Sequence, residues 1–201
     1  YERAVVLVGA HAATGDDDPR SSTPITSYSF SRDLNVGLLM FEHIVAFESA
    51  RSVAVGIENL SGADVESFPL TEASTEGRFT NAIAAFPQLR VDWLQLDDHN
   101  IHTRLGGLFA WSAEPGGVVD PILTSIAEDG ERIDDDAVNY HGGRPARFYG
   151  TEIDLQIGYT LRDHFHWVLE GAYLIPGPAL QDANGDAVDA YLLENRFVVT
   201  F

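Results

Sequence analysis

The stretch "YGTEIDLQIGYTL" (149–161) decides the fold class of this chain. Its residues alternate between two sets, with Ile153 and Leu155 on one parity and Glu152 and Asp154 on the other. This period of two predicts a β-strand with one apolar face and one polar face. The alternation continues for 13 residues, which is about twice the length of an ordinary globular strand.

Segments with the same alternation recur along the chain. The neighbouring stretch "HFHWVLEGAYLI" (164–175) begins after a spacing typical of a hairpin. The sequence therefore predicts an all-β, antiparallel fold of about seven strands. The other expected strands lie at 3–13, 27–41 (as one long or two short strands), 80–94, 101–112 and 189–201. Pro87 lacks a ladder donor, so a bulge or a strand start is expected there.

The expected connections fall into two length classes. Those at 95–99 and 162–163 are short, whereas those at 43–80, 114–147 and 177–188 are long and rich in Gly, Pro, Asp and Ser. Transmembrane barrels separate short periplasmic turns from long extracellular loops in this way. The sequence therefore predicts an antiparallel transmembrane β-barrel with short periplasmic turns and long extracellular loops.

Aromatic residues at the strand ends fit the same prediction. Amphipathic rings are typical of the two interfaces between lipid and water. The residues expected in these positions are Trp93, Trp111, Tyr149, Tyr159, Trp167 and Tyr173.

The predicted strand count also bears on domain organisation. About seven strands is an odd number, whereas bacterial single-chain barrels have an even number of strands. We therefore expect residues 1–201 to be the C-terminal portion of a single barrel domain, with upstream strands outside this chain.

Composition excludes several function classes. The formal net charge of −19 and the pI of about 4.4 argue against nucleic acid as a partner. The absence of Cys excludes disulfides, zinc–thiolate sites and thiol catalysis. No GxSxG motif supports a serine nucleophile, so no enzymatic activity is predicted.

The polar parity of the expected strands provides candidates for a lumen lining. Charged rings can select solutes in a channel, but arginines and carboxylates occur here in mixed order. That order favours a solvated or salt-bridged interior over a filter of one sign. The candidates are Arg90, Asp92, His102, Arg104, Glu152, Asp154, His164, His166 and Glu170.

Two stretches are candidates for metal sites. His164 and His166 share a face, where Glu170 or Asp154 could complete a site, but interfacial or hydrogen-bonded histidines are the more common case. The loop "DANGDAVD" (182–189) partly resembles the start of a calcium loop but lacks the Glu expected at its twelfth position. An ordinary turn is favoured, and no cofactor is predicted; Ca²⁺ in an extracellular loop is the weaker alternative. Its ligands would be Asp182, Asn184, Asp186 and Asp189.

Several phrases resemble the C-terminal strands of alginate-export-type outer membrane barrels and of large myxobacterial-type barrel proteins. They are "YSFSRDLNVGLLMFEHIVA" (28–46), "TNAIAAFPQLRVDWL" (80–94), "LGGLFAWSAEP" (105–115) and residues 149–180. The tail "RFVVTF" resembles the signal that the outer membrane insertion machinery reads, with Phe197, Val199 and Phe201 on one face. The resemblance implies a barrel fold and an outer membrane location.

Function is expected to follow from that location. The leading expectation is a porin-like or exporter-like channel for small polar solutes or polysaccharide. One alternative is a non-conducting anchoring barrel that binds a protein partner through loops 43–80 and 114–147. Another is a soluble all-β carbohydrate-binding domain. For a barrel, the other expected partners are the lipid bilayer, lipopolysaccharide and the insertion machinery.

Overall fold

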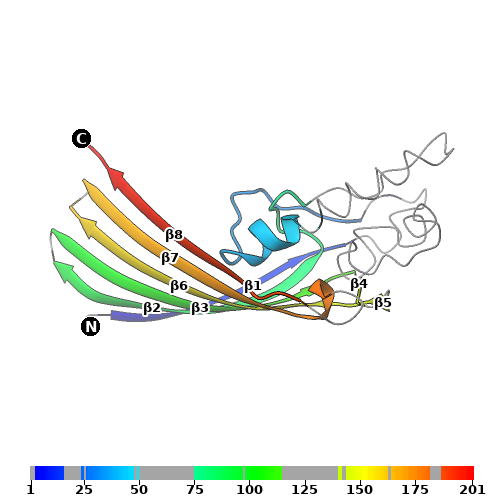
Figure 1. Ribbon diagram of the computed structural model, residues 1–201. Coiled ribbons are helices and arrows are strands. Elements are labelled where there is room, and N and C mark those ends of the chain that lie inside the picture. Colours follow the sequence, from blue (N-terminus) through cyan, green and yellow to red (C-terminus); the bar gives the residue numbers. More distant parts are fainter. Residues whose placement is uncertain are drawn as a thin grey trace.

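The chain folds into one large antiparallel sheet (Figure 1). The computed structural model describes residues 3–15, 24, 26–47, 49, 75–96, 98–114, 140–141, 144–162, 164–181 and 187–201. The sheet has six strands in the order β1-β2-β3-β6-β7-β8, so the predicted all-β, antiparallel fold is confirmed. The strands are β1 (Arg3–Ala13), β2 (Ala82–Leu96), β3 (His99–Ser112), β6 (Phe148–Leu161), β7 (Phe165–Pro176) and β8 (Ala190–Val199).

The remaining elements are short. Strands β4 (Tyr140–His141) and β5 (Arg144–Pro145) pair with each other. A π-helix, η1, spans Met40–Val45, and a 3-10 helix, η2, spans Pro178–Leu180. In the described part of the chain, no helix is long and apolar enough to span a membrane.

Short and long connections lie at opposite ends of the sheet, as the sequence predicts. The turns from β2 to β3 and from β6 to β7 lie at the left in Figure 1, beside Arg3 of β1 and Val199 of β8. The connections from β1 to β2, from β3 to β6 and from β7 to β8 all leave the opposite end. We call these the turn end and the loop end.

The prediction of a strand at 27–41 is wrong, and the large sheet therefore has six strands rather than about seven. This stretch forms turns that lead into η1, apart from one isolated bridge between Ser29 and Thr80. Its sequence "VGLLMF" is apolar on both parities, and Met40, Phe41 and Val45 are all buried. That spacing suits a helical turn packed on a surface better than a strand with one polar face.

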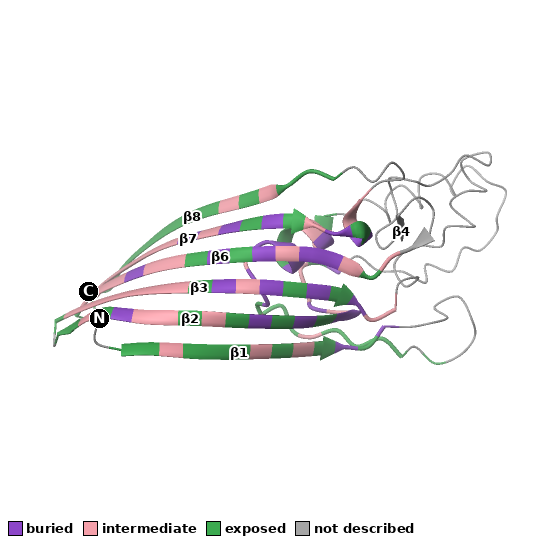
Figure 2. Cartoon of the chain, turned by 90° about the horizontal axis from the view of Figure 1, so that it is seen from below, coloured by how far each residue is buried: buried purple, intermediate pink, exposed green. Residues whose placement is uncertain are grey.

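Each long strand separates apolar from polar residues. One row crosses the whole sheet through directly paired positions and contains no polar side chain. It consists of Val6, Leu89, Leu105, Leu155, Gly171 and Leu193. Figure 2 shows how exposed and buried residues alternate along the strands. The sheet curves so that the inner segment, residues 28–45, lies over its concave face (Figure 1). Ala84 and Leu108 pack in the core with this segment, so the apolar row, which has the opposite parity, lies on the convex face.

Two irregularities interrupt the ladder. The register shifts at Trp93, between Asp92 and Leu94, and again between Ala110 and Trp111. The expected bulge at Pro87 is wrong, because β2 continues through this residue without a change of register.

The register shift between Ala110 and Trp111 leaves Tyr149 outside the ladder, and the Tyr149 side chain is 1% exposed on the concave side. The expected interfacial position of Tyr149 is therefore also wrong.

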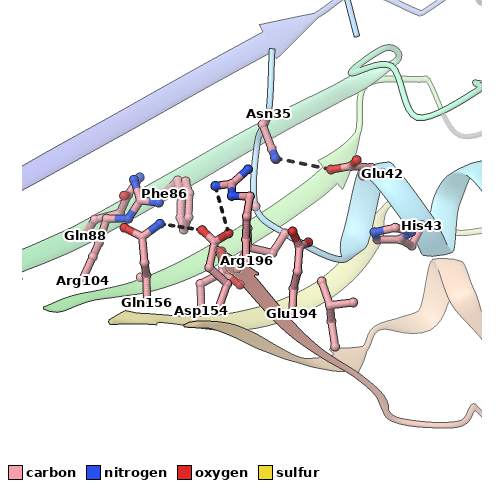
Figure 3. A pocket seen from close by; sticks show the side chains of 15 residues that line it. Asn35, Glu42, His43, Phe86, Gln88, Arg104, Asp154, Gln156, Glu194 and Arg196 are labelled. Carbon is pink, nitrogen blue, oxygen red and sulfur yellow. Dashed lines mark hydrogen bonds and ion pairs between the residues drawn. The ribbon is translucent and has the colours of Figure 1, made fainter. Parts of the chain in front are cut away.

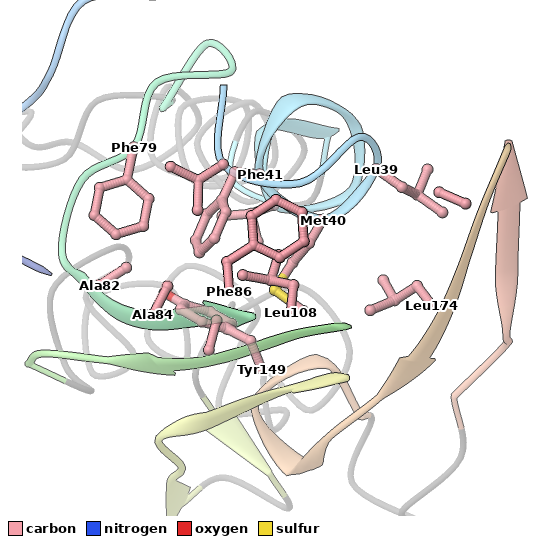
Figure 4. Close-up of a cluster of buried hydrophobic side chains, with 14 of the residues drawn as sticks. Leu39, Met40, Phe41, Phe79, Ala82, Ala84, Phe86, Leu108, Tyr149 and Leu174 are labelled. Carbon is pink, nitrogen blue, oxygen red and sulfur yellow. The ribbon is translucent and has the colours of Figure 1, made fainter. Parts of the chain in front are cut away.

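The hydrophobic core lies between the inner segment and the loop-end half of the concave face (Figure 4). The Phe41 ring packs edge-on against Phe79 at a centroid distance of 4.8 Å and against Tyr149 at 6.1 Å. Met40 and Leu108 are fully buried. Small residues on the facing strands leave room for these rings; they include Ala82, Ala84, Ala110 and Ala172.

Gly37 allows the inner segment to approach the sheet. Its φ is +80°, and a Cβ there would meet Leu108 Cδ2 at 2.6 Å and Glu152 Oε1 at 2.9 Å. Gly77 has the same φ of +80°, but the nearest atom to an added Cβ lies at 3.4 Å. Comparing a substitution at each glycine therefore separates the free-energy cost of a positive φ from the cost of steric overlap.

We predict that Gly37→Ala lowers the free energy of unfolding more than Gly77→Ala. The positive φ costs about 1–2 kcal/mol at both positions, whereas steric overlap is added only at Gly37. Chemical denaturation of both variants tests this prediction. Equal losses would show that the inner segment does not pack closely against Leu108 and Glu152.

The two turns are joined by an exposed ion pair. Arg162 Nε and Nη2 donate hydrogen bonds to Asp98 at 3.0 and 3.1 Å, and the Arg162 backbone N–H donates to the Asp98 carbonyl at 2.7 Å. The hydrogen bonds and the positive charge of Arg162 lower the pKa of the Asp98 carboxyl from its usual value. Because the pKa of Asp98 is lower in the folded state than in the unfolded state, the ion pair stabilises the fold at pH values above the unfolded-state pKa. This stabilisation is lost as the pH falls through the folded-state pKa.

We predict that Arg162→Ala raises the pKa of Asp98 toward the ordinary value of about 3.9. A pH titration of the Asp98 carboxyl carbon by NMR measures the shift directly. Arg147→Ala is the control, because Arg147 interacts at the loop end with Glu114 and the carbonyl of Ala113. An unchanged Asp98 pKa in Arg162→Ala would contradict the assignment.

Candidate functional site: the concave face beneath the inner segment

A single carboxylate anchors the inner segment to the sheet. Glu152 Oε1 accepts hydrogen bonds from the backbone N–H of Leu38 at 2.6 Å and of Leu39 at 2.9 Å, and Oε2 accepts one from Met40 at 2.6 Å. Gly37 precedes these residues and turns the backbone toward the carboxylate. The contact therefore joins the start of η1 to the middle of the β-sheet.

This arrangement satisfies the hydrogen-bonding needs of both the carboxylate and the backbone N–H groups. The first N–H groups of a helix have no partner within the helix, and a negative charge near them is favourable. Glu152 is 0% exposed, and a buried carboxylate is costly unless it receives several hydrogen bonds. Because the three donors are backbone groups, the anchor depends on the path of the chain rather than on the side chains of residues 38–40.

A cavity lies on the turn-end side of this anchor (Figure 3). Its volume is about 460 Å³, within the range of about 300–1,000 Å³ that is usual for small-molecule sites. The inner segment contributes Asn35, Gly37, Leu38, Glu42 and His43 to the lining. The sheet contributes Phe86, Gln88, Arg104, Gly106, Asp154, Gln156, Glu170, Leu192, Glu194 and Arg196.

Some of the lining groups are already paired. Gln156 Nε2 donates to Glu170 Oε1 at 2.5 Å, and Arg196 Nη2 lies 3.8 Å from Glu170 Oε2. Asn35 Nδ2 donates to Glu42 at 3.3 Å. These bonds orient amide and carboxylate groups around the cavity (Figure 3).

Two lining groups have unused hydrogen-bonding capacity. Asp154 is 7% exposed, and its Oδ1 has no hydrogen-bond partner within the described part of the chain. Arg104 makes no hydrogen bond or ion pair within 4.0 Å to any described residue. The cavity thus presents both a donor and an acceptor that a ligand could use.

The predicted lumen residues lie mainly on the concave face, but only part of them reach the cavity. Arg104, Asp154 and Glu170 line it, whereas Glu152 lies under the inner segment. Arg90 and Asp92 pair with each other at 2.9 Å.

His102 lies over Gly158 nearer the turn end, where a Cβ on Gly158 would meet the imidazole Cε1 at 2.2 Å. A side chain at this position would therefore require the His102 imidazole to move.

His164 and His166 do not form a common site. His164 is in the turn, and its Nδ1 lies 3.2 Å from the Thr200 carbonyl. His166 is on the concave parity, 3.3 Å from Thr160 Oγ1. The described residues contain no group of three or more His, Asp or Glu side chains arranged to hold a metal ion.

The weak calcium candidates are only partly described. Asp182, Asn184 and Asp186 lie outside the described residues. Asp189 is described, and its Oδ2 accepts a hydrogen bond from the Tyr173 hydroxyl.

The predicted assembly-signal residues are exposed. Phe197 and Val199 lie on the convex parity of β8, and Phe201 follows the strand. The Phe197 ring is close to Trp167 and Phe165, with centroid distances of 6.4 and 6.3 Å. Recognition by the insertion machinery stays a prediction, and the loops proposed for a protein partner, 43–80 and 114–147, lie largely outside the described residues.

Sequence reasoning missed much of the cavity lining. Gln88, Gln156, Glu194 and Arg196 share the parity of the predicted lumen residues, so period two alone could have identified them. Asn35, Glu42 and His43 could not be placed in this way, because their segment is not a strand. The helical spacing of Met40, Ile44 and Val45 was the available signal.

The chain matches no protein-family model, and it has no significant match among curated proteins or solved structures.

We predict that Glu152→Gln loosens the inner segment. A neutral amide offers one carbonyl oxygen in place of two charged acceptors, so at least one of the three N–H groups loses its partner, at a cost of about 1–3 kcal/mol. Hydrogen exchange at the amides of Leu38, Leu39 and Met40 should accelerate by about 5–150-fold, the factor that this free energy corresponds to.

Glu194→Gln is the matched control. Glu194 is on the same face but is exposed on β8 and makes no hydrogen bond to the described part of the inner segment. Equal acceleration in both variants, or none in Glu152→Gln, would show that the carboxylate does not hold the segment.

Proposed function

We propose that the sheet is part of the wall of an outer membrane β-barrel that admits small polar solutes. In this proposal the convex face contacts lipid, the concave face lines the lumen, and the inner segment narrows it. Further strands pair with the free edges of β1 and β8 and close the wall, because an open sheet edge is not tolerated within the hydrocarbon region.

The observation that carries the proposal is the exposed apolar convex face. The outward positions of all six strands in the sheet carry no charged side chain. Large side chains there are well exposed, including Val8 at 77%, Leu105 at 51% and Leu193 at 74%. Soluble monomers rarely expose a continuous apolar surface of this extent. This face therefore argues against the soluble carbohydrate-binding alternative.

Aromatic residues occupy the two ends of the convex face, with aliphatic residues between them. Near the turn end, Tyr159, Trp167 and Phe197 form adjacent paired positions. Near the loop end, the Trp111 and Phe148 rings lie 5.4 Å apart, and Tyr173 pairs with Tyr191. This distribution is typical of the aromatic girdles of membrane barrels.

The spacing between the aromatic positions agrees with the thickness of a membrane. Ile101 is at the level of Tyr159, and Trp111 lies about ten residues further along β3. At about 3.4 Å per residue and a tilt of about 40°, this separation spans about 26 Å across the membrane. The apolar band of such barrels is about 25 Å tall.

Two indole N–H groups on this face are paired within the sheet. Trp93 Nε1 donates to Thr103 Oγ1 at 2.9 Å, and Trp167 Nε1 donates to Asn195 Oδ1 at 2.7 Å. Each bond satisfies an indole donor together with a side-chain acceptor, which reduces the cost of contact with lipid.

A non-conducting anchoring barrel is the second candidate. It is favoured by the apolar core beneath the inner segment, which fills the loop-end half of the concave face. The polar cavity on the turn-end side favours passage of solutes instead. The relation to alginate-export-type barrels stays a prediction from the sequence phrases.

A charge placed on either face tests the membrane proposal. We predict that Leu155→Arg lowers the free energy of unfolding from lipid vesicles by about 2–4 kcal/mol, the cost of an arginine at the bilayer midplane. Gln156→Arg is the control, because this neighbouring residue is on the concave face beside Glu170, and we expect a change below about 1 kcal/mol. Equal effects, or a protein that stays monodisperse in water without detergent, would overturn the proposal.

Conductance separates a channel from an anchor. We predict that the full protein forms stable ion-conducting units in planar lipid bilayers. A protein that inserts into the bilayer but does not conduct would support the anchoring barrel.

A further inference from the structure

We propose that the cavity beneath the inner segment is a binding site for a neutral polyhydroxylated solute, such as a short neutral saccharide. The proposal deepens the proposed function, because it names the class of solute that the lumen would admit. It is carried by the unpaired groups, the mixed charges and the apolar wall of the cavity.

The unpaired groups require a ligand that both donates and accepts hydrogen bonds. Arg104 on β3 offers guanidinium N–H donors, and Asp154 on β6 has an unpaired Oδ1. The two strands are adjacent, with Arg104 opposite Gln156 and Gly106 opposite Asp154. A hydroxyl group can accept from the guanidinium and donate to the Asp154 Oδ1, so neighbouring hydroxyls on one ring could serve both.

The charges around the cavity disfavour an ion of either sign. An anionic ligand would meet Glu170 and Glu194, whereas a cationic ligand would meet Arg104 and Arg196. Like charges brought together in a partly desolvated site are costly. A neutral ligand avoids this cost and can still use each group as a hydrogen-bond partner.

The apolar part of the lining suits the C–H face of a sugar ring. Phe86 lies against Gly106, where an added Cβ would meet the ring Cε2 at 2.6 Å. Leu38 and Leu192 add apolar surface from the inner segment and from β8. A ring with hydroxyls at its edge and C–H groups on its faces would thus match both parts of the lining.

The test uses three trisaccharides of similar size and different charge. Titration calorimetry of the full protein in detergent would compare maltotriose, which is neutral, with a glucosamine trimer, which is cationic, and a galacturonic acid trimer, which is anionic. We expect saturable binding of maltotriose and at least about tenfold weaker binding of both charged trimers. Absence of maltotriose binding, or preference for a charged trimer, would overturn the proposal.

A pair of arginine variants locates the site. We expect Arg104→Gln to weaken maltotriose binding about tenfold. Arg3→Gln should change it less than twofold, because Arg3 is exposed on β1 and does not line the cavity. Circular dichroism confirms that both variants keep the β-sheet. Equal affinities in the two folded variants would exclude this cavity as the site.

Bilayer measurements separate this proposal from the proposed function. Conductance that maltotriose does not reduce, together with no calorimetric binding, would refute the saccharide site but leave the channel. Maltotriose binding without conductance would support the site and refute the channel.

Discussion

The fold depends on how Glu152 is accommodated on the concave face. A carboxylate with 0% exposure in the middle of a sheet would be strongly unfavourable without partners. The backbone of residues 38–40 supplies three donors, and those donors are themselves the unpaired N–H groups at the start of a helix. The carboxylate and the three N–H groups therefore satisfy each other's need for a hydrogen-bond partner. The apolar core and the cavity lie on either side of this contact.

The two faces of the sheet carry different kinds of side chain on the same strands. On the convex face, neighbouring strands present aliphatic and aromatic side chains, and the indole donors of Trp93 and Trp167 are paired locally. On the concave face, small residues such as Ala84 and Ala110 make room for the inner segment. Toward the turn end this face carries polar residues instead, and Arg90 and Asp92 form an ion pair there. The concave face thus changes from core to polar lining along the length of the strands.

The sequence predicted the strands well because alternation is a local property. Leu155 and Asp154 could be assigned to opposite faces from their neighbours alone, and the structure places them so. The inner segment could not be assigned in this way. Its position depends on Gly37 fitting against Leu108 and on Glu152, and both partners are remote in sequence. Tyr149 was misplaced for a related reason, because a register shift between paired strands changes facing without changing the local pattern.

The distance along the chain between the partners of this contact sets an order of assembly. Glu152 follows Met40 by 112 residues, so residues 38–40 have no acceptor until β6 has joined the sheet. The strands of the large sheet are ordered as they follow one another in the chain, and the β6–β7 hairpin closes through a short turn. Closing a long loop costs entropy before its contacts form. The inner segment can therefore complete its hydrogen bonds to Glu152 only once β6 has taken its place beneath it.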